Sequence, residues 1–175
     1  MSDAGQAEET VAPEPPQERY GVPVTDSRGQ AVLHPSRDGL DKFVMGLRDD
    51  QGFVMLDDLT AVDYLAYDAD RGLPASVAPE RFELVVGLLS LARRERIRLR
   101  VQVPEADATV PTLFHVHPGA EALEREVLDM FGIQFAGHPD PSRILMPEDW
   151  SGYPLRKDYA IGRIPVQFKG IENAR

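Results

Sequence analysis

The fold is decided by residues 81–103, which read RFELVVGLLSLARRERIRLRVQV. Residues 81–89 form a mostly aliphatic run, and residues 96–103 alternate strictly between aliphatic and polar side chains. This alternation places the aliphatic side chains on a core face and the arginines on the opposite face. Because only six residues separate the two runs, we predict an antiparallel hairpin.

The flanking segments supply the other elements of the predicted fold. Apolar residues at helical spacing predict helices over 36–50 and 119–131, and Gly132 is placed to end the second helix in a left-handed conformation. Two short apolar runs, 53–56 and 61–67, predict strands separated by a turn. Two hairpins flanked by helices indicate an α+β fold, in which an antiparallel sheet carries helices packed on one face.

Composition divides the chain into three regions. Residues 1–19 hold five acidic residues and one arginine, which predicts a disordered acidic tail. Residues 20–136 form the α+β domain. Residues 137–175 lose all periodicity yet keep aromatic side chains, so we predict an extended irregular arm that docks on another surface. That surface could be its own domain, although the length of the arm favours a partner protein.

The overall composition excludes several classes of protein. A net charge of −10 opposes general binding of nucleic acid, which depends on neutralising phosphates. The absence of cysteine excludes disulfides, cysteine nucleophiles and Cys-ligated iron–sulfur clusters. The longest apolar run, 84–92, is far shorter than the roughly 20 residues of a membrane span. With no secretory signal visible, we expect a cytoplasmic protein.

A metal site is the first chemical possibility. His115 and His117 point to the same side of an extended segment, and Glu124 or His138 could complete the set. The helical zinc spacing H-E-x-x-H is absent, however. Two polar histidines before a helix are therefore the favoured interpretation.

A carboxylate pair is the second possibility. Glu126 and Asp129 lie one helical turn apart, a spacing compatible with acid–base chemistry. Arg125 would keep both ionised rather than raise one pKa, so a structural ion-pair network is favoured. The sequence also lacks a glycine loop of either nucleotide-binding type. The residues taken alone indicate no active site.

The most specific motifs lie in the run that begins at Glu124 and reads EREVLDMFGIQFAGHPDPSRILMPEDWSGYPLRKDY. This run resembles the signature of the C subunit of NADH-quinone oxidoreductase, the thirty-kilodalton subunit of respiratory complex I. The resemblance covers about residues 36–170. The family motif and interface residues that it indicates are Glu124, Arg125, Glu126, Asp129, Phe131, Gly132, Gly137, His138, Pro139, Arg143, Trp150, Pro154, Leu155, Arg156, Lys157, Asp158 and Tyr159.

The resemblance implies a non-catalytic structural subunit in the peripheral arm of a proton-translocating NADH:quinone oxidoreductase. In that family the subunit binds no cofactor itself and clasps the quinone-site subunit, while flavin, iron–sulfur clusters and quinone belong to partner subunits. The implied location is the cytoplasmic face of the cell membrane, through other subunits. Two alternatives stay open: a related membrane complex with a ferredoxin, deazaflavin or hydrogenase donor, and a stand-alone metal-dependent hydrolase.

Roles for individual residues follow as expectations. We expect Arg125 to be an ion-pair hub between Glu121 and Asp129 that fixes the helix against the start of the arm. The other basic residues of the motif should pair with acids, some on the partner, namely Arg143, Arg156 and Lys157. Three aromatic side chains should dominate the binding energy, namely Trp150, Tyr153 and Tyr159.

Overall fold

The computed structural model describes residues 17–160. Two helices and one 3-10 turn accompany eight strands within this range. Their bounds are β1 Glu18–Arg19, β2 Val22–Ser27, β3 Gln30–Leu33, α1 Leu40–Asp49, β4 Met55–Asp63, β5 Phe82–Ser90, β6 Glu95–Val103, η1 Glu105–Asp107, β7 Thr109–Pro111, α2 Ala120–Phe131 and β8 Gln134–Ala136.

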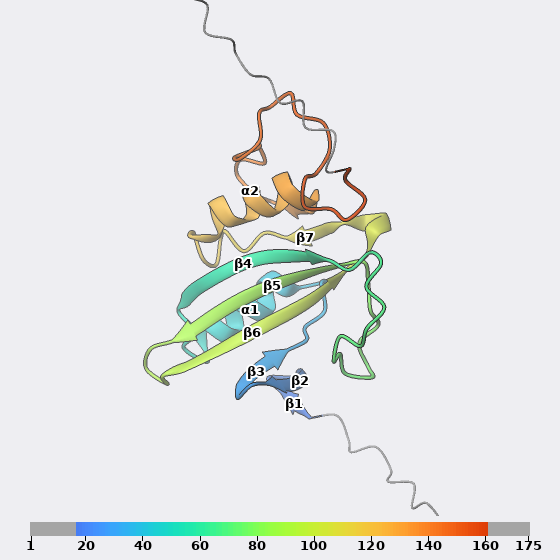
Figure 1. Ribbon diagram of the computed structural model, residues 1–175. Helices are drawn as coiled ribbons and strands as arrows, with labels where there is room; N and C mark the ends of the chain where they lie inside the picture. The colour runs from blue at the N-terminus through green and yellow to red at the C-terminus, as the bar shows by residue number, and fades with distance from the viewer. Residues whose placement is uncertain (1–16, 161–175) are drawn as a thin grey trace, which may run out of the picture.

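The main sheet has six strands in the order β1-β2-β3-β6-β5-β4 (Figure 1). Neighbouring strands are antiparallel except β3 and β6, which run parallel. The predicted hairpin is confirmed, because β5 and β6 pair along their whole length, with Leu84 opposite Val101 and Leu88 opposite Ile97. Strands β7 and β8 form a separate two-stranded parallel sheet.

Both helices cover the same face of the sheet. The buried core joins the inward aliphatic residues of β5 and β6 to Leu40, Val44 and Leu47 of α1 and to Ala120 and Val127 of α2. Helix α1 lies behind β5 and β6 in Figure 1, and α2 lies along the edge strand β4. The α+β fold with helices on one face is therefore confirmed.

The region between α1 and β5 differs from the prediction. In place of the two predicted strands around a turn, 53–56 and 61–67, the structure has one continuous strand, β4, from Met55 to Asp63, which is bulged between Leu56 and Asp58. The bulge places the side chain of Asp57 over Gly87, where a Cβ would meet it at 3.5 Å. The acidic pair that suggested a turn is therefore accommodated by a bulge within the strand.

Two element ends also differ. Helix α1 begins at Leu40 rather than near residue 36, because Gly39 has a left-handed backbone with φ 77°. The ordered sheet begins at Glu18, inside the predicted 1–19 tail, since Arg19 makes a two-pronged pair with Glu95 at 2.5 and 2.9 Å. The rest of that tail, residues 1–16, lies outside the described residues.

Helix α2 matches its predicted range closely, and Gly132 ends it with φ 74° as expected. The chain then turns back, and in Figure 1 the arm first runs on the side of α2 away from the sheet and then returns beside the helix end, where Lys157 reaches Asp63 of β4. Residues 161–175, the rest of the predicted arm, lie outside the described range. Among residues 17–160, no helix is long and apolar enough to cross a bilayer.

Candidate functional site

The first part of the arm is attached to α2 by one carboxylate. Asp129, fully buried on α2, accepts hydrogen bonds from the backbone N–H groups of Ile144, Leu145 and Met146 at 3.2, 2.8 and 2.8 Å. Arg143 completes the set with an ion pair at 2.5 Å. Burial alone would raise the pKa of Asp129, but the three N–H donors and Arg143 outweigh it and hold the pKa below its usual value.

A second buried carboxylate holds the end of the described arm. Asp63, the last residue of β4, is paired with Arg81 at 2.9 Å and accepts from the backbone N–H of Lys157 at 2.9 Å. Arg81 also reaches Asp158 at 3.0 Å. Burial opposes the charge on Asp63, yet Arg81 and the N–H groups of Leu65 and Lys157 lower its pKa.

Arg156, the residue before Lys157, is held by a carbonyl and two rings. Its Nε donates to the carbonyl of Phe131 at 2.5 Å, and its guanidinium lies 5.0 Å from the ring centre of Phe82 and 4.4 Å from that of Tyr153. A Cβ on Gly132 would come within 2.6 Å of both Arg156 and Tyr153. Glycine is therefore needed here for space as well as for its positive φ.

Glu124 is a third buried carboxylate, on α2 and close to His138 at the start of the arm. It accepts from the hydroxyl of Thr112 at 2.5 Å and from the N–H of Leu113 at 2.6 Å. Nε2 of His138 lies 3.9 Å away but makes its hydrogen bond to the carbonyl of Glu121, at 3.1 Å. Because burial outweighs these contacts, the pKa of Glu124 is raised.

The histidines do not gather around Glu124 as metal ligands. His115 is exposed and packs edge-on against Phe114, whereas His117 is buried. Within residues 17–160 no group of three His, Asp or Glu side chains has an arrangement that could hold a metal ion. The geometry thus gives no support to the metal-site hypothesis.

Arg125 fixes α2 against the arm, but with partly different contacts from those expected. It pairs with Glu121 at 3.2 Å and donates to the carbonyl and hydroxyl of Ser142 at 3.1 and 2.9 Å. Asp129 is not its partner, since that carboxylate turns inward to Arg143. For the same reason Asp129 makes no pair with Glu126, which is exposed.

The other motif residues line the arm itself. Leu155 donates its N–H to the carbonyl of Met130 at 3.1 Å while its side chain is 50% exposed. The ring of Tyr159 packs against Gly152, where a Cβ would approach it to 2.8 Å. Of the rest, Pro139 is exposed, Gly137 has φ 85°, and the half-buried ones are Trp150 and Pro154.

Three residues of this site were not predicted from the sequence, namely Asp63, Arg81 and Phe82. A signal for Asp63 was present. On β4 the core face carries Leu59, Ala61 and then Asp63, so an acid occupies the next inward position. An acid at a core-facing position requires a partner, and here the partners are Arg81 and the arm.

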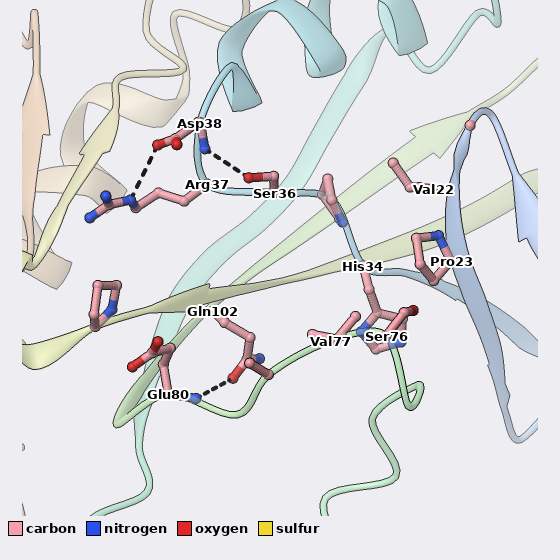
Figure 2. A pocket seen from close by; sticks show the side chains of 14 residues that line it. Val22, Pro23, His34, Ser36, Arg37, Asp38, Ser76, Val77, Glu80 and Gln102 are labelled. Carbon is pink, nitrogen blue, oxygen red and sulfur yellow. Dashed lines mark hydrogen bonds and ion pairs between the residues drawn. The ribbon is translucent and has the colours of Figure 1, made fainter. Parts of the chain in front are cut away.

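A separate hollow of about 570 Å³ lies between the β1–β2 turn, the β3–α1 connection and residues 76–80 (Figure 2). Buried His34 lines it and shares a hydrogen bond of 2.9 Å with Thr25 through Nε2. Burial lowers the pKa of His34 to about 4, so the ring is neutral at pH 7. No residue of the family motif lines this hollow.

Most of this chain, including the described part of the arm, matches a known protein family. Residues 33–164 match the family model described as respiratory-chain NADH dehydrogenase, 30 Kd subunit. The C subunit of NADH-quinone oxidoreductase from Herpetosiphon aurantiacus is 42% identical over 99% of this chain and 94% of its own length. Its counterpart from Saccharopolyspora erythraea is 43% identical over 85% of the chain, which spans only 57% of that relative.

Two solved structures share the fold. A trypsin-resistant fragment (1-134) of Nqo5 has a TM-score of 0.59 at 38% identity, covering 69% of this chain and 89% of the fragment. A chain of the membrane-bound sulfane sulfur reductase, an archaeal respiratory membrane complex, also has a TM-score of 0.59, at 22% identity over 88% of this chain and 90% of its own. The second likeness concerns the fold alone.

Proposed function

This chain belongs to the family of 30 kDa subunits of the respiratory-chain NADH dehydrogenase, and we propose that it is a non-catalytic structural subunit of the peripheral part of a proton-translocating NADH:quinone oxidoreductase. Its arm, residues 137–175, binds the subunit that carries the quinone site. The complex attaches it to the cytoplasmic face of the membrane. Flavin, iron–sulfur clusters and quinone belong to other subunits, in keeping with a chain that has no cysteine to ligate a cluster.

The observation that carries this proposal is the two-sided character of the arm. On its inner side, Asp129 and Asp63 bind the arm backbone and fix its path. On its outer side, the large apolar side chains of Ile144, Leu145 and Leu155 are 40%, 59% and 50% exposed. Apolar side chains on a fixed, preorganised backbone are suited to dock into a partner at low entropic cost.

The buried charges near the arm support a structural rather than a chemical role. Asp129 and Asp63 accept hydrogen bonds from several donors of this chain, and Arg156 is held by one hydrogen bond and two aromatic rings. The Nqo5 fragment described as trypsin-resistant ends at its residue 134. That end supports an arm that is separable from a self-sufficient domain in this chain as well.

The test is co-purification of the complex from detergent-solubilised membranes. Deletion of residues 137–175 should abolish recovery of the quinone-site subunit with this chain. A finer variant is the triple change I144S/L145S/L155S, which leaves the backbone contacts to Asp129 intact. Its matched control is V54S/L91S, since Val54 and Leu91 are exposed to 59% and 66% and lie at the end of the β4–β5 pair opposite to Asp63. Normal recovery with the triple variant would contradict the proposal.

A complex with another electron donor is the second candidate, because the same fold occurs in the archaeal sulfane sulfur reductase complex. Mass spectrometry of the purified complex discriminates between the two. A flavin-bearing NADH-oxidising subunit is expected. A ferredoxin-, deazaflavin- or hydrogen-oxidising subunit in its place would favour the alternative.

A further inference from the structure

The face of the sheet opposite the helices carries a hollow of about 380 Å³. Its floor is made of Val32, Val62 and Val85, with Arg98 and Arg100 of β6 between them. Its walls come from β2 and from the connection 64–81 that follows β4. The valines of the floor are apolar, and the charged residues that line the hollow are three arginines and two acids.

Arg98 is exceptional among the arginines of residues 17–160. Every other half-buried arginine has its guanidinium bound to a carboxylate or to a carbonyl oxygen. These bound arginines are Arg19, Arg37, Arg48, Arg71, Arg81, Arg100, Arg125, Arg143 and Arg156. Arg98, itself half-buried, has no such contact within the described residues. Among the described residues, the guanidinium nitrogens of Arg98 do not belong to the fully buried polar atoms that lack a partner, so water reaches them and they are available to a carboxylate from outside the chain.

Each of the two acids that line the hollow accepts hydrogen bonds from other groups of this chain. Glu83 is paired with Arg100 at 2.7 and 3.0 Å and accepts from Gln102 at 2.6 Å. Asp26 accepts from the N–H of Gly29 at 3.0 Å, within the β2–β3 turn. Neither carboxylate makes an ion pair with Arg98.

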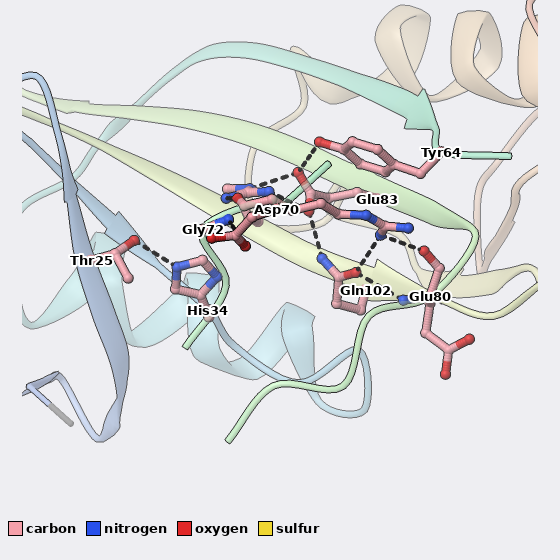
Figure 3. Close-up of polar contacts among 10 residues, drawn as sticks. Thr25, His34, Tyr64, Asp70, Gly72, Glu80, Glu83 and Gln102 are labelled. Atoms are coloured by element: carbon pink, nitrogen blue, oxygen red, sulfur yellow. Dashed lines mark hydrogen bonds and ion pairs between the residues drawn. The ribbon is translucent and has the colours of Figure 1, made fainter. Parts of the chain in front are cut away.

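The wall next to Arg100 is held rigidly (Figure 3). Arg100 donates to the carbonyl of Arg71 at 3.0 Å, and Arg71 donates to the carbonyl of Glu80 at 2.6 Å. The guanidinium of Arg71 also stacks on the ring of Tyr64, at 3.9 Å from its centre. A wall fixed in this way keeps the hollow open without a ligand, so that binding costs little ordering.

We propose that this hollow receives an aspartate or glutamate side chain of a neighbouring subunit, whose carboxylate pairs with Arg98 while its methylene groups pack on the valine floor. The inference rests on the proposed function, since it needs an assembled complex. A net charge of −10 repels acidic partners in general. The unpaired guanidinium supplies the local attraction that lets one acidic side chain dock in a defined register.

A carbodiimide, which couples an amine to a carboxylate in direct contact, tests this in the purified complex. The variant R98K places a primary amine in the hollow and keeps the positive charge. Its matched control is R96K, on the same strand face but exposed and paired with Asp57 at 3.4 Å within the chain. The amine of R96K should couple to Asp57, which proves that the chemistry works.

The expected result for R98K is a coupled peptide joining position 98 to an Asp or Glu of another subunit. A second measurement uses R98Q, for which we expect about a tenfold rise in the fraction of this chain released at a given salt concentration, with R96Q near wild type. Coupling of R98K only to carboxylates of this chain, including those of residues 1–16, would overturn the inference, as would no coupling at all. If the wild-type chain recovers no other subunit, the proposed function itself fails.

Discussion

Asp129 and Arg143 form an ion pair at 2.5 Å in which the aspartate side chain is fully buried and the arginine side chain is 19% exposed. One residue belongs to α2 and the other to the arm, fourteen positions later. Since the same carboxylate also binds three consecutive backbone N–H groups, it fixes both the side chain and the backbone of the arm. Removal of this one charge should therefore release the segment that carries the exposed apolar side chains.

The first prediction concerns D129N in the full chain. The change removes the charge that Arg143 needs and should lower the free energy of unfolding by about 3 kcal/mol at pH 7. Urea denaturation followed by circular dichroism measures it. E126Q is the matched control on the same helix, because Glu126 is exposed, and it should change stability by less than about 0.5 kcal/mol.

The destabilisation by D129N should depend on pH. Because the folded-state pKa of Asp129 is lowered, its stabilisation is complete above the unfolded-state value and is lost as pH falls through the folded-state value. The difference between wild type and D129N should consequently shrink in acid. A difference that stays constant down to the acid transition would show that the charge is not the cause.

Glu124 should behave in the opposite way. Its folded-state pKa is raised by burial, so its favourable contribution is present below the unfolded-state value and is lost as pH rises through the folded-state value. E124Q stays neutral throughout and should gain stability relative to wild type as pH increases. Unfolding free energies of both proteins across a pH series provide the measurement, and a pH-independent difference would refute the assignment.

Substitution of Gly132 tests whether steric contact with the arm destabilises the fold beyond the cost of a positive φ. G132A places a methyl group within 2.6 Å of Arg156 and Tyr153, in addition to the cost of φ 74°. G29A is the control, because Gly29 has φ 79° with nothing within 4 Å. We expect about 1 kcal/mol of destabilisation for G29A and about 1–3 kcal/mol more for G132A, measured by thermal unfolding. Equal destabilisation by G132A and G29A would mean that Arg156 and Tyr153 move away from the added methyl group without a cost in stability.

Arg156 should be irreplaceable by lysine. R156A loses two ring contacts and the hydrogen bond to Phe131, which should cost about 1–2 kcal/mol. R156K should recover little, because an ammonium group lacks the planar fork that stacks on both rings. K157A is the neighbouring control, since Lys157 is exposed and bonds to the rest of residues 17–160 only through its backbone N–H. Limited trypsin digestion of the arm offers a second readout.

Elements with a local signal could be predicted from the amino-acid sequence alone. Strict alternation in β6 and the apolar stripe of α2 identified their buried faces, and Gly132 marked the helix end. The motif beginning at Glu124 indicated the family, which the match over residues 33–164 confirms. Such features need only neighbours along the chain, because side-chain periodicity follows directly from backbone geometry.

The pairing of the charges, in contrast, depends on the three-dimensional arrangement of the chain. Asp129 lies four residues from Arg125, yet it bonds to Arg143, and Asp63 holds the arm at Lys157, 94 residues away. The bulge in β4 likewise appears only in the pairing of β4 with β5. A buried carboxylate must be paired with hydrogen-bond donors, and the tertiary structure determines which donors lie close to it. Sequence spacing therefore does not predict the partner.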